Sequence, residues 1–191
     1  MDEVSRARAL LYDFLSLFFL PDFDDEKYRT AKEVIENIPS TGIEDFDAAK
    51  EALAASLRKK EAAEIREEFE TLFITPFEGA QIPLEASYYL EGKIYGPSLS
   101  KLRELLLEIG LVKQGDVSEP EDHLGLLLAF MAEAIRKKGL SRQRKLFYNF
   151  LRPCALEVAG KIEGERAPFY RLVGGMLKAF LRIEEHFFEE N

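Results

Sequence analysis

Apolar residues recur at helical spacing along most of this sequence, and this periodicity limits the possible folds more than any other feature. It is clearest in residues 124–135, 97–110 and 168–188, where apolar side chains return every three or four positions. No segment alternates apolar and polar residues over enough positions to predict a strand, and no repeat has the spacing of a solenoid. Caps and stop signals divide the chain into about eight to ten helices. The sequence therefore predicts an all-α bundle.

Length and composition predict one domain. A chain of 191 residues is large enough to bury a substantial core, so we expect a single all-helical domain over residues 1–191. Residues 75–97 lack a helical period and contain three prolines, Pro76, Pro83 and Pro97, together with many apolar side chains. This composition predicts a long loop that packs onto the protein.

Charge and cysteine content restrict the partners and the compartment. With 35 acidic and 26 basic residues, the net charge of −9 disfavours binding to nucleic acid and favours cationic partners. A single cysteine, Cys154, excludes disulfides within the chain and thiolate metal sites, and it points to the cytoplasm. The apolar run at residues 9–20 is interrupted by Asp13 and is too short to span a bilayer, so we interpret it as a core helix.

The stretch from Ser118 to Met131 places one of only two histidines beside the most apolar helix. Ser118 and Glu121 have the spacing of a capping box, which predicts a helix that begins there and ends before Gly139. On such a helix His123 lies at the edge of an apolar face, with Asp122 about a quarter-turn away. Helix capping alone explains the acidic residues, and a histidine at the edge of an apolar face is more often packed than catalytic.

Three ordered motifs resemble those of the TorD/DmsD/NarJ-type redox-enzyme maturation chaperones. Residues 119–124 read Glu-Pro-Glu-Asp-His-Leu and lead a helix containing Leu-Ala-Phe-Met at 128–131. About fifty residues earlier, 69–73 read Phe-Glu-Thr-Leu-Phe, and the loop between them carries Ile-Pro at 82–83, Ser-Tyr-Tyr at 87–89 and Tyr-Gly at 95–96. Leu84 and Glu85 depart from the family, whose members often have a second proline and an aromatic residue there.

This resemblance implies a TorD-like helical fold and a cytoplasmic assembly chaperone. Such a protein binds the N-terminal twin-arginine leader of a molybdopterin oxidoreductase catalytic subunit and supports cofactor insertion before export or membrane docking. The molybdopterin cofactor would belong to the client, with none bound stably by the chaperone itself. The family also implies a monomer or a domain-swapped dimer.

A leader with two arginines and an apolar run would need carboxylates and an apolar groove. We therefore predict a peptide-binding site in which Asp122 and His123 polarise one end of the groove. The remaining predicted site residues are Glu119, Glu121, Tyr12, Phe69, Leu72, Pro83, Ser87 and Tyr89.

Two alternatives use the same residues differently: a helical enzyme with an Asp122–His123 acid/base pair, and a generic helical adaptor. Adjacent residues on a helix point apart, so Asp122 would orient the imidazole of His123 poorly. The sequence also offers no nucleophile motif, HExxH metal-ligand set or dinucleotide fingerprint. A binding protein is therefore favoured over an enzyme.

Overall fold

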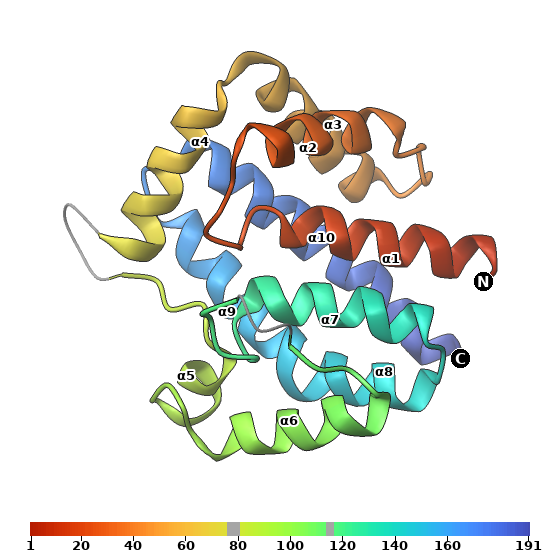
Figure 1. Cartoon of the computed structure of the whole chain (residues 1–191). Helices are drawn as coiled ribbons and strands as arrows, with labels where there is room; N and C mark the ends of the chain where they lie inside the picture. Colours follow the sequence, from red (N-terminus) through yellow and green to blue (C-terminus); the bar gives the residue numbers. More distant parts are fainter. Residues whose placement is uncertain (76–80, 114–116) are drawn as a thin grey trace. The chain divides into compact units, whose positions relative to one another are not determined.

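The computed structural model describes residues 1–75, 81–113 and 117–191, and within these ranges its regular secondary structure consists of helices, without strands (Figure 1). Ten α-helical segments are present there, and π turns extend two of them. The predicted all-α fold is thus confirmed. None of the helices in the described ranges has the length and apolar content to cross a membrane.

The chain forms two compact units, one made of Met1–Leu20 and Leu84–Glu157, the other of Pro21–Pro83 and Val158–Asn191. Helix α9 (Arg152–Glu163) carries the chain from the first unit into the second. That the whole chain acts as a single domain stays a prediction.

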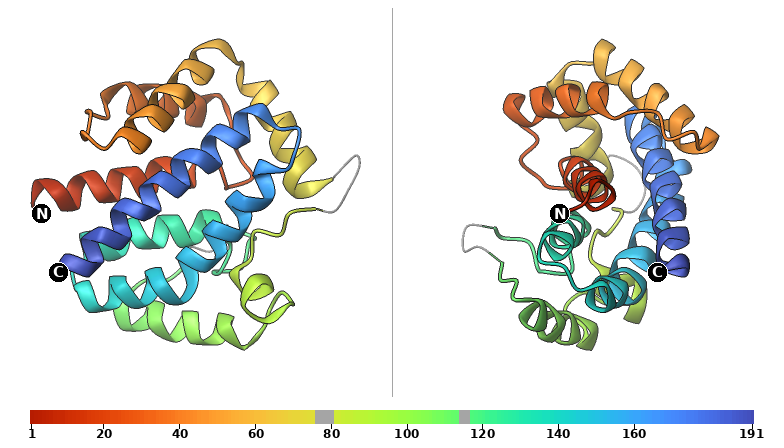
Figure 2. Two further views of the ribbon diagram at one scale, coloured as in Figure 1. Left: turned by 180° about the vertical axis from the view of Figure 1, so that it is seen from behind. Right: turned by 90° about the vertical axis from the view of Figure 1, so that its right-hand side faces the viewer.

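The first unit is built on the contact between α1 and α7, which lie side by side in Figures 1 and 2. Its elements are α1 (Glu3–Ser16), α5 (Ala86–Glu91), α6 (Pro97–Ile109), α7 (Leu124–Arg136), α8 (Leu140–Leu146), the π turn η2 (Phe147–Leu151) and the first half of α9. Helix α6 packs on α5 and α8, while α7 packs on α8 and η2. Gly125 allows the turn after α1 to approach α7 closely. A Cβ on residue 125 would lie only 2.9 Å from the side chain of Leu20 in that turn.

The second unit packs α10 against α3 and α4, and α2 against α3. Its elements are α2 (Asp25–Asn37), α3 (Glu44–Lys59), α4 (Ala62–Phe69), the π turn η1 (Glu70–Ile74), the second half of α9 and α10 (Pro168–Glu190). Gly174 sits inside the unbroken α10, and a Cβ at this position would lie 3.7 Å from Ala159 of α9. This distance is an ordinary van der Waals contact, and α10 continues through Gly174 and Gly175 without interruption.

The segment predicted to be a loop contains the short helix α5. Ile82, Leu84 and Ala86 are buried, as expected for a segment that packs down, but much of the rest of it is exposed. Residues 76–80, which include Pro76, lie outside the described residues. The first helix also differs from the core helix expected over residues 9–20, because α1 ends at Ser16 and residues 17–20 form a turn.

Candidate functional site

Helix α7 begins at Leu124, and His123 is its N-cap. The Gly125 backbone N–H donates to Nδ1 of His123 at 3.2 Å, so the imidazole serves as the capping acceptor. The predicted start at Ser118 with a capping box to Glu121 is therefore wrong. The Ser118 hydroxyl donates instead to the Glu119 carboxylate at 2.8 Å, outside any helix.

A pairing with a distant segment determines where α7 starts. The Leu124 N–H donates to the Leu84 carbonyl at 2.7 Å, the Ala86 N–H donates to the Asp122 carbonyl at 2.9 Å, and Glu85 forms an antiparallel bridge with His123. This pairing keeps the backbone at His123 extended, with ψ at 133°, so the helix begins only after it.

Asp122 caps α5 from across this pairing. Its Oδ2 accepts the Ser87 N–H at 2.8 Å, whereas Glu85, the residue at the N-cap position of α5, makes no side-chain cap. The second oxygen, Oδ1, and the Ser87 hydroxyl are buried without a hydrogen-bond partner in the described part of the chain. The aspartate of the motif thus holds the first turn of α5 in place.

Both central residues of the motif are buried, Asp122 with 1% of its surface exposed and His123 with 6%. Burial lowers the pKa of His123 to about 4, although the nearby charges of Glu119 and Asp122 act in the opposite direction. The imidazole is therefore neutral at pH 7, as its acceptor role toward Gly125 requires. Burial is also the main reason that the pKa of the Glu85 carboxyl is raised.

The other half of the motif reaches solvent. Glu121 forms an ion pair with Arg103 at 2.8 Å, and this hydrogen bond is the main cause of its lowered pKa. Glu119 is half-buried, and its carbonyl accepts a hydrogen bond from the Lys113 ammonium at 2.8 Å. Among the predicted acidic residues, these two carboxylates are the ones that a partner can reach.

The remaining predicted residues are divided between the two units. Tyr12 and Ser87 are fully buried in the first unit, and Tyr89 is half-buried there, with a phenol pKa that burial raises well above its usual value. Residues Phe69, Leu72 and Pro83 belong to the second unit. The structure therefore brings Asp122 and His123 together with Ser87, while a common groove for all ten residues stays a prediction.

Phe69 and Leu72 are buried in the second unit. The ring of Phe69 lies 5.1 Å from that of Phe73 and 6.2 Å from that of Tyr170, centroid to centroid. The motif at residues 69–73 is not a continuous α-helix, because α4 ends at Phe69 and the chain continues as a π turn. These contacts show that both side chains contribute to the core, and their contact with a peptide stays a prediction.

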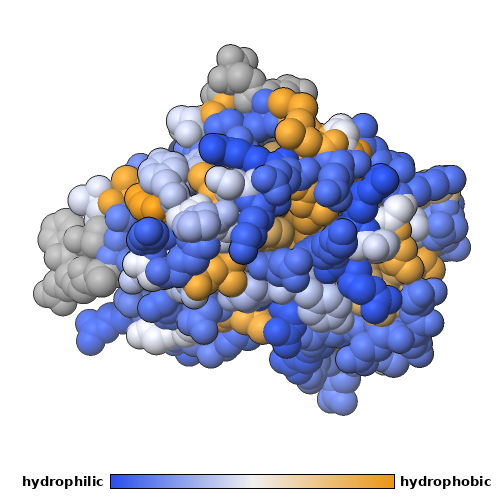
Figure 3. All heavy atoms as spheres, turned by 90° about the horizontal axis from the view of Figure 1, so that it is seen from below, coloured by the Kyte–Doolittle hydropathy of each residue, from blue (hydrophilic) through white to orange (hydrophobic). Residues whose placement is uncertain are grey.

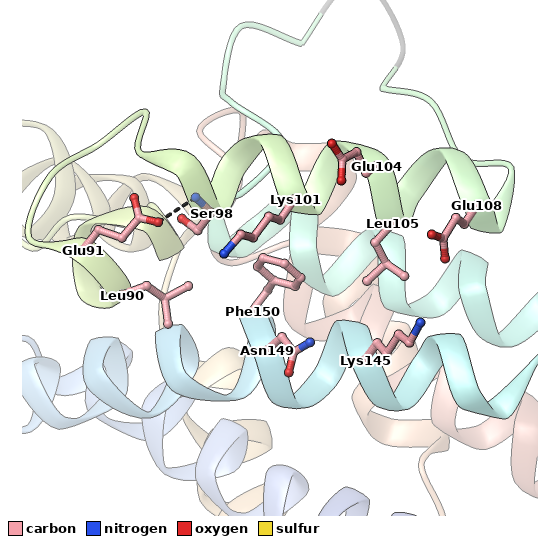
Figure 4. Close-up of a pocket in the computed structure, with 10 residues that line it drawn as sticks. All are labelled: Leu90, Glu91, Ser98, Lys101, Glu104, Leu105, Glu108, Lys145, Asn149 and Phe150. Atoms are coloured by element: carbon pink, nitrogen blue, oxygen red, sulfur yellow. Dashed lines mark hydrogen bonds between the residues drawn. The ribbon is translucent and has the colours of Figure 1, made fainter.

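The first unit also contains a cavity of about 510 Å³ that was not predicted from the sequence (Figure 4). Leu90 of α5, Leu105 of α6 and Phe150 of η2 supply its apolar lining, and we call this cavity the α6 groove. Charged residues, among them Lys101, Glu104, Glu108 and Lys145, stand around it. No spacing in the sequence could have revealed it, because the lining residues come from α5, α6, α8 and η2, which only the fold brings together.

Comparison with known proteins identifies the family. The profile of the family described as nitrate reductase delta subunit matches residues 43–155. A Haemophilus influenzae protein named "Probable Tat proofreading chaperone DmsD" is 37% identical over 86 residues, which cover 42% of this chain and 42% of that protein. The chaperone protein TorD of Vibrio cholerae is 25% identical over 137 residues, which cover 68% of this chain and 62% of TorD.

A solved structure of an Archaeoglobus fulgidus protein described as a redox enzyme maturation protein shares the fold. The TM-score is 0.62 and the sequence identity 24%, over 97% of this chain and 96% of the other. The match to the family profile covers more than half of the sequence and includes all three motifs. This chain therefore belongs to the nitrate reductase delta subunit family, the group of redox-enzyme maturation chaperones that its motifs resemble.

Proposed function

We propose that this protein is a cytoplasmic assembly chaperone for the catalytic subunit of a molybdopterin oxidoreductase. It binds the N-terminal leader of that subunit, a segment with two arginines and an apolar run, and supports cofactor insertion before export or membrane docking. The observation that carries the proposal is the family match over residues 43–155, together with relatives that are named as chaperones.

The surface charge of the protein suits such a leader. A net charge of −9 attracts a basic segment, and Glu119 and Glu121 offer carboxylates at the surface. Glu121 already pairs with Arg103, whose side chain is 52% exposed. Exposed ion pairs contribute little to stability, so a leader arginine can replace Arg103 at small cost.

The chemistry of the buried residues favours a binding protein over an acid/base enzyme. The imidazole Nδ1 of His123 accepts the Gly125 N–H, and one carboxylate oxygen of Asp122 accepts the Ser87 N–H. Both side chains therefore form hydrogen bonds that hold the backbone at the start of a helix. Burial also raises the pKa of the Cys154 thiol, which disfavours a reactive thiolate.

Titration calorimetry with a synthetic leader tests this function. The peptide is the N-terminal leader of a molybdopterin oxidoreductase catalytic subunit from the same organism, and the control peptide carries glutamine in place of both arginines. We expect the intact leader to bind and the control to bind at least about tenfold more weakly, since one lost charged hydrogen bond accounts for that factor. Equal affinity for both peptides, or no binding of the intact leader, would refute the proposal.

A further inference from the structure

Basic residues gather in one stretch of this acidic chain. Residues 134–156 hold seven of the 26 lysines and arginines and none of the 35 aspartates and glutamates. The rest of the chain therefore has 19 basic and 35 acidic residues, and its charge is more negative than the total of −9. The whole stretch belongs to the first unit. That unit thus carries a positive region, although the protein as a whole is acidic.

Six of these cations stand close together at the surface, at the end of α7, in the turn after it and on α8 (Figure 1). All six are exposed, and we call them the basic surface: Arg136, Lys137, Lys138, Arg142, Arg144 and Lys145. Helix α8 packs on α7 and has only seven residues, so it is about 10 Å long. This length is comparable with the Debye length of about 8–10 Å at physiological salt, so the six charges act on a partner as one field.

The helix dipole accounts for only part of the basic surface. Arg136 and Lys137 lie at the end of α7, where cations are favoured. Arg142 lies in the first turn of α8, where a cation is disfavoured, and Lys145 places a like charge one turn away. Lys138 has a positive φ of 64°, which a glycine adopts at lower cost. These charges therefore work against local stability, and this favours a role in binding.

The carboxylates around the basic surface neutralise little of it. Asp13 and Glu133 both pair with Arg136, so two acids are matched to one cation. Within the described residues, four of the other cations form no ion pair: Lys137, Lys138, Arg142 and Lys145. Glu104 and Glu108 line the α6 groove near this surface but are not paired with it there. Most of the positive charge is therefore open to a partner.

The form of the basic surface suits lipid headgroups better than a fixed cluster of carboxylates. Specific recognition of carboxylates uses arginine forks in a set geometry, whereas three of these six cations are lysines, which act as point charges on flexible stems. Tyr148, which is 37% exposed, follows on η2, and tyrosine rings are common at the headgroup level of membranes. Figure 3, seen from below the view of Figure 1, shows mostly hydrophilic side chains with apolar patches among them, which favours attraction by charge over insertion.

We propose that the basic surface binds anionic lipid headgroups and holds the protein reversibly at a membrane. Each lysine or arginine near an anionic bilayer strengthens binding by about fivefold. The acidic remainder of the protein is repelled by the same bilayer, so residues 136–145 face the lipid. A client that is exported or docks at a membrane brings the chaperone to such a surface. Lipid binding does not depend on the leader, however, so its failure would leave the proposed function intact.

Vesicle sedimentation tests the proposal. The protein is mixed with vesicles of phosphatidylcholine and phosphatidylglycerol, and in parallel with vesicles of phosphatidylcholine alone. We expect it to sediment only with the anionic vesicles, and to be released as the salt concentration rises. Equal sedimentation with both kinds of vesicle, or with neither, would overturn the proposal. Retention on poly-glutamate without binding to anionic vesicles would assign the surface to an acidic protein partner, and would also overturn it.

Two triple variants with the same change in net charge separate the basic surface from the charge of the whole protein. The test variant replaces three cations of the surface: Lys138→Gln, Arg142→Gln and Lys145→Gln. The control replaces three exposed cations of the second unit that form no ion pair within the described residues: Lys59→Gln, Lys161→Gln and Arg166→Gln. The test variant should bind anionic vesicles at least about tenfold more weakly, and the control should lose much less.

A third variant guards against a loss caused by unfolding. Lys138→Arg, Arg142→Lys and Lys145→Arg together keep the charge at the same positions, so this variant should retain binding and an unchanged circular dichroism spectrum. Equal losses in the test and control variants would show that net charge alone governs binding. That result, or a loss in the charge-conserving variant as large as in the test variant, would overturn the proposal.

Discussion

Helices α5 and α10 have the same capping arrangement, but they depend on it to different degrees. In each, a carboxylate from a distant part of the sequence accepts N–H groups of the first turn. Asp122 accepts the Ser87 N–H in α5, and Glu68 accepts the N–H groups of Phe169 and Tyr170 in α10, at 2.9 and 3.1 Å.

The two helices differ in what else stabilises them. Helix α10 has 23 residues and buries an apolar stripe along its length, whereas α5 has six residues, of which Ala86 and Ser87 are buried. Apolar burial scales with the number of buried side chains, so α10 is held by its core and α5 by its polar contacts. One carboxylate therefore determines whether a helix forms only where the helix buries few apolar side chains.

The largest expected effect comes from the core of α10. Phe180 is fully buried, so Phe180→Ala should lower the free energy of unfolding by about 3–5 kcal/mol. Urea denaturation followed by circular dichroism measures this loss. A loss below about 1 kcal/mol would show that the apolar stripe does not hold α10, and the contrast with α5 would fail.

Removing the cap of α5 should have a smaller but more local effect. Asp122→Ala leaves the buried Ser87 N–H without a partner, which should destabilise the structure by about 1–3 kcal/mol. Amide hydrogen exchange should show most of this loss in residues 86–91, and Asp122→Asn should restore most of it. Equal acceleration of exchange along α10 would contradict a local role for Asp122.

Helices with complete local signals could be predicted from the sequence. Pro97 and Gly110 bound α6, and Pro168 opens α10, and both helices lie within about two residues of the segments predicted at 97–110 and 168–188. In each case the residues that start or stop the helix are neighbours in the sequence, so their chemistry is visible without a fold.

The site was harder to predict because distant residues determine it. The start of α7 depends on the hydrogen bond from Leu124 to Leu84, forty positions earlier, and the local pattern at Ser118 pointed to the wrong residue. The α6 groove likewise needs Leu90 and Phe150 to meet, which no spacing in the sequence reveals. The sequence identified the motif, but the fold is required to see what its residues hold.

The third prediction concerns pH and compares His123 with a residue that cannot titrate. The unfolded chain takes up a proton on His123 near pH 6.5, whereas burial lowers the pKa in the folded protein to about 4. Stability should therefore fall as the pH drops from about 6.5 toward 4, by about 2 kcal/mol at pH 5. His123→Asn keeps a capping oxygen for the Gly125 N–H and should lack this part of the pH dependence. Urea denaturation of both proteins at pH 7.5 and pH 5 measures the difference, and parallel losses would exclude His123 as its source.

The smallest effect is expected at the cap of α10. Glu68→Ala removes the acceptor of two N–H groups, but the buried stripe of α10 remains, so the loss should be about 1 kcal/mol. Amide exchange should accelerate only in the first turn, at Phe169 and Tyr170, while the rest of the helix keeps its protection. Glu68→Gln serves as the control, because its amide oxygen can still accept these N–H groups. If Glu68→Ala instead released the whole of α10, the cap would hold the long helix as firmly as Asp122 holds the short one, and helix length would not explain the difference between them.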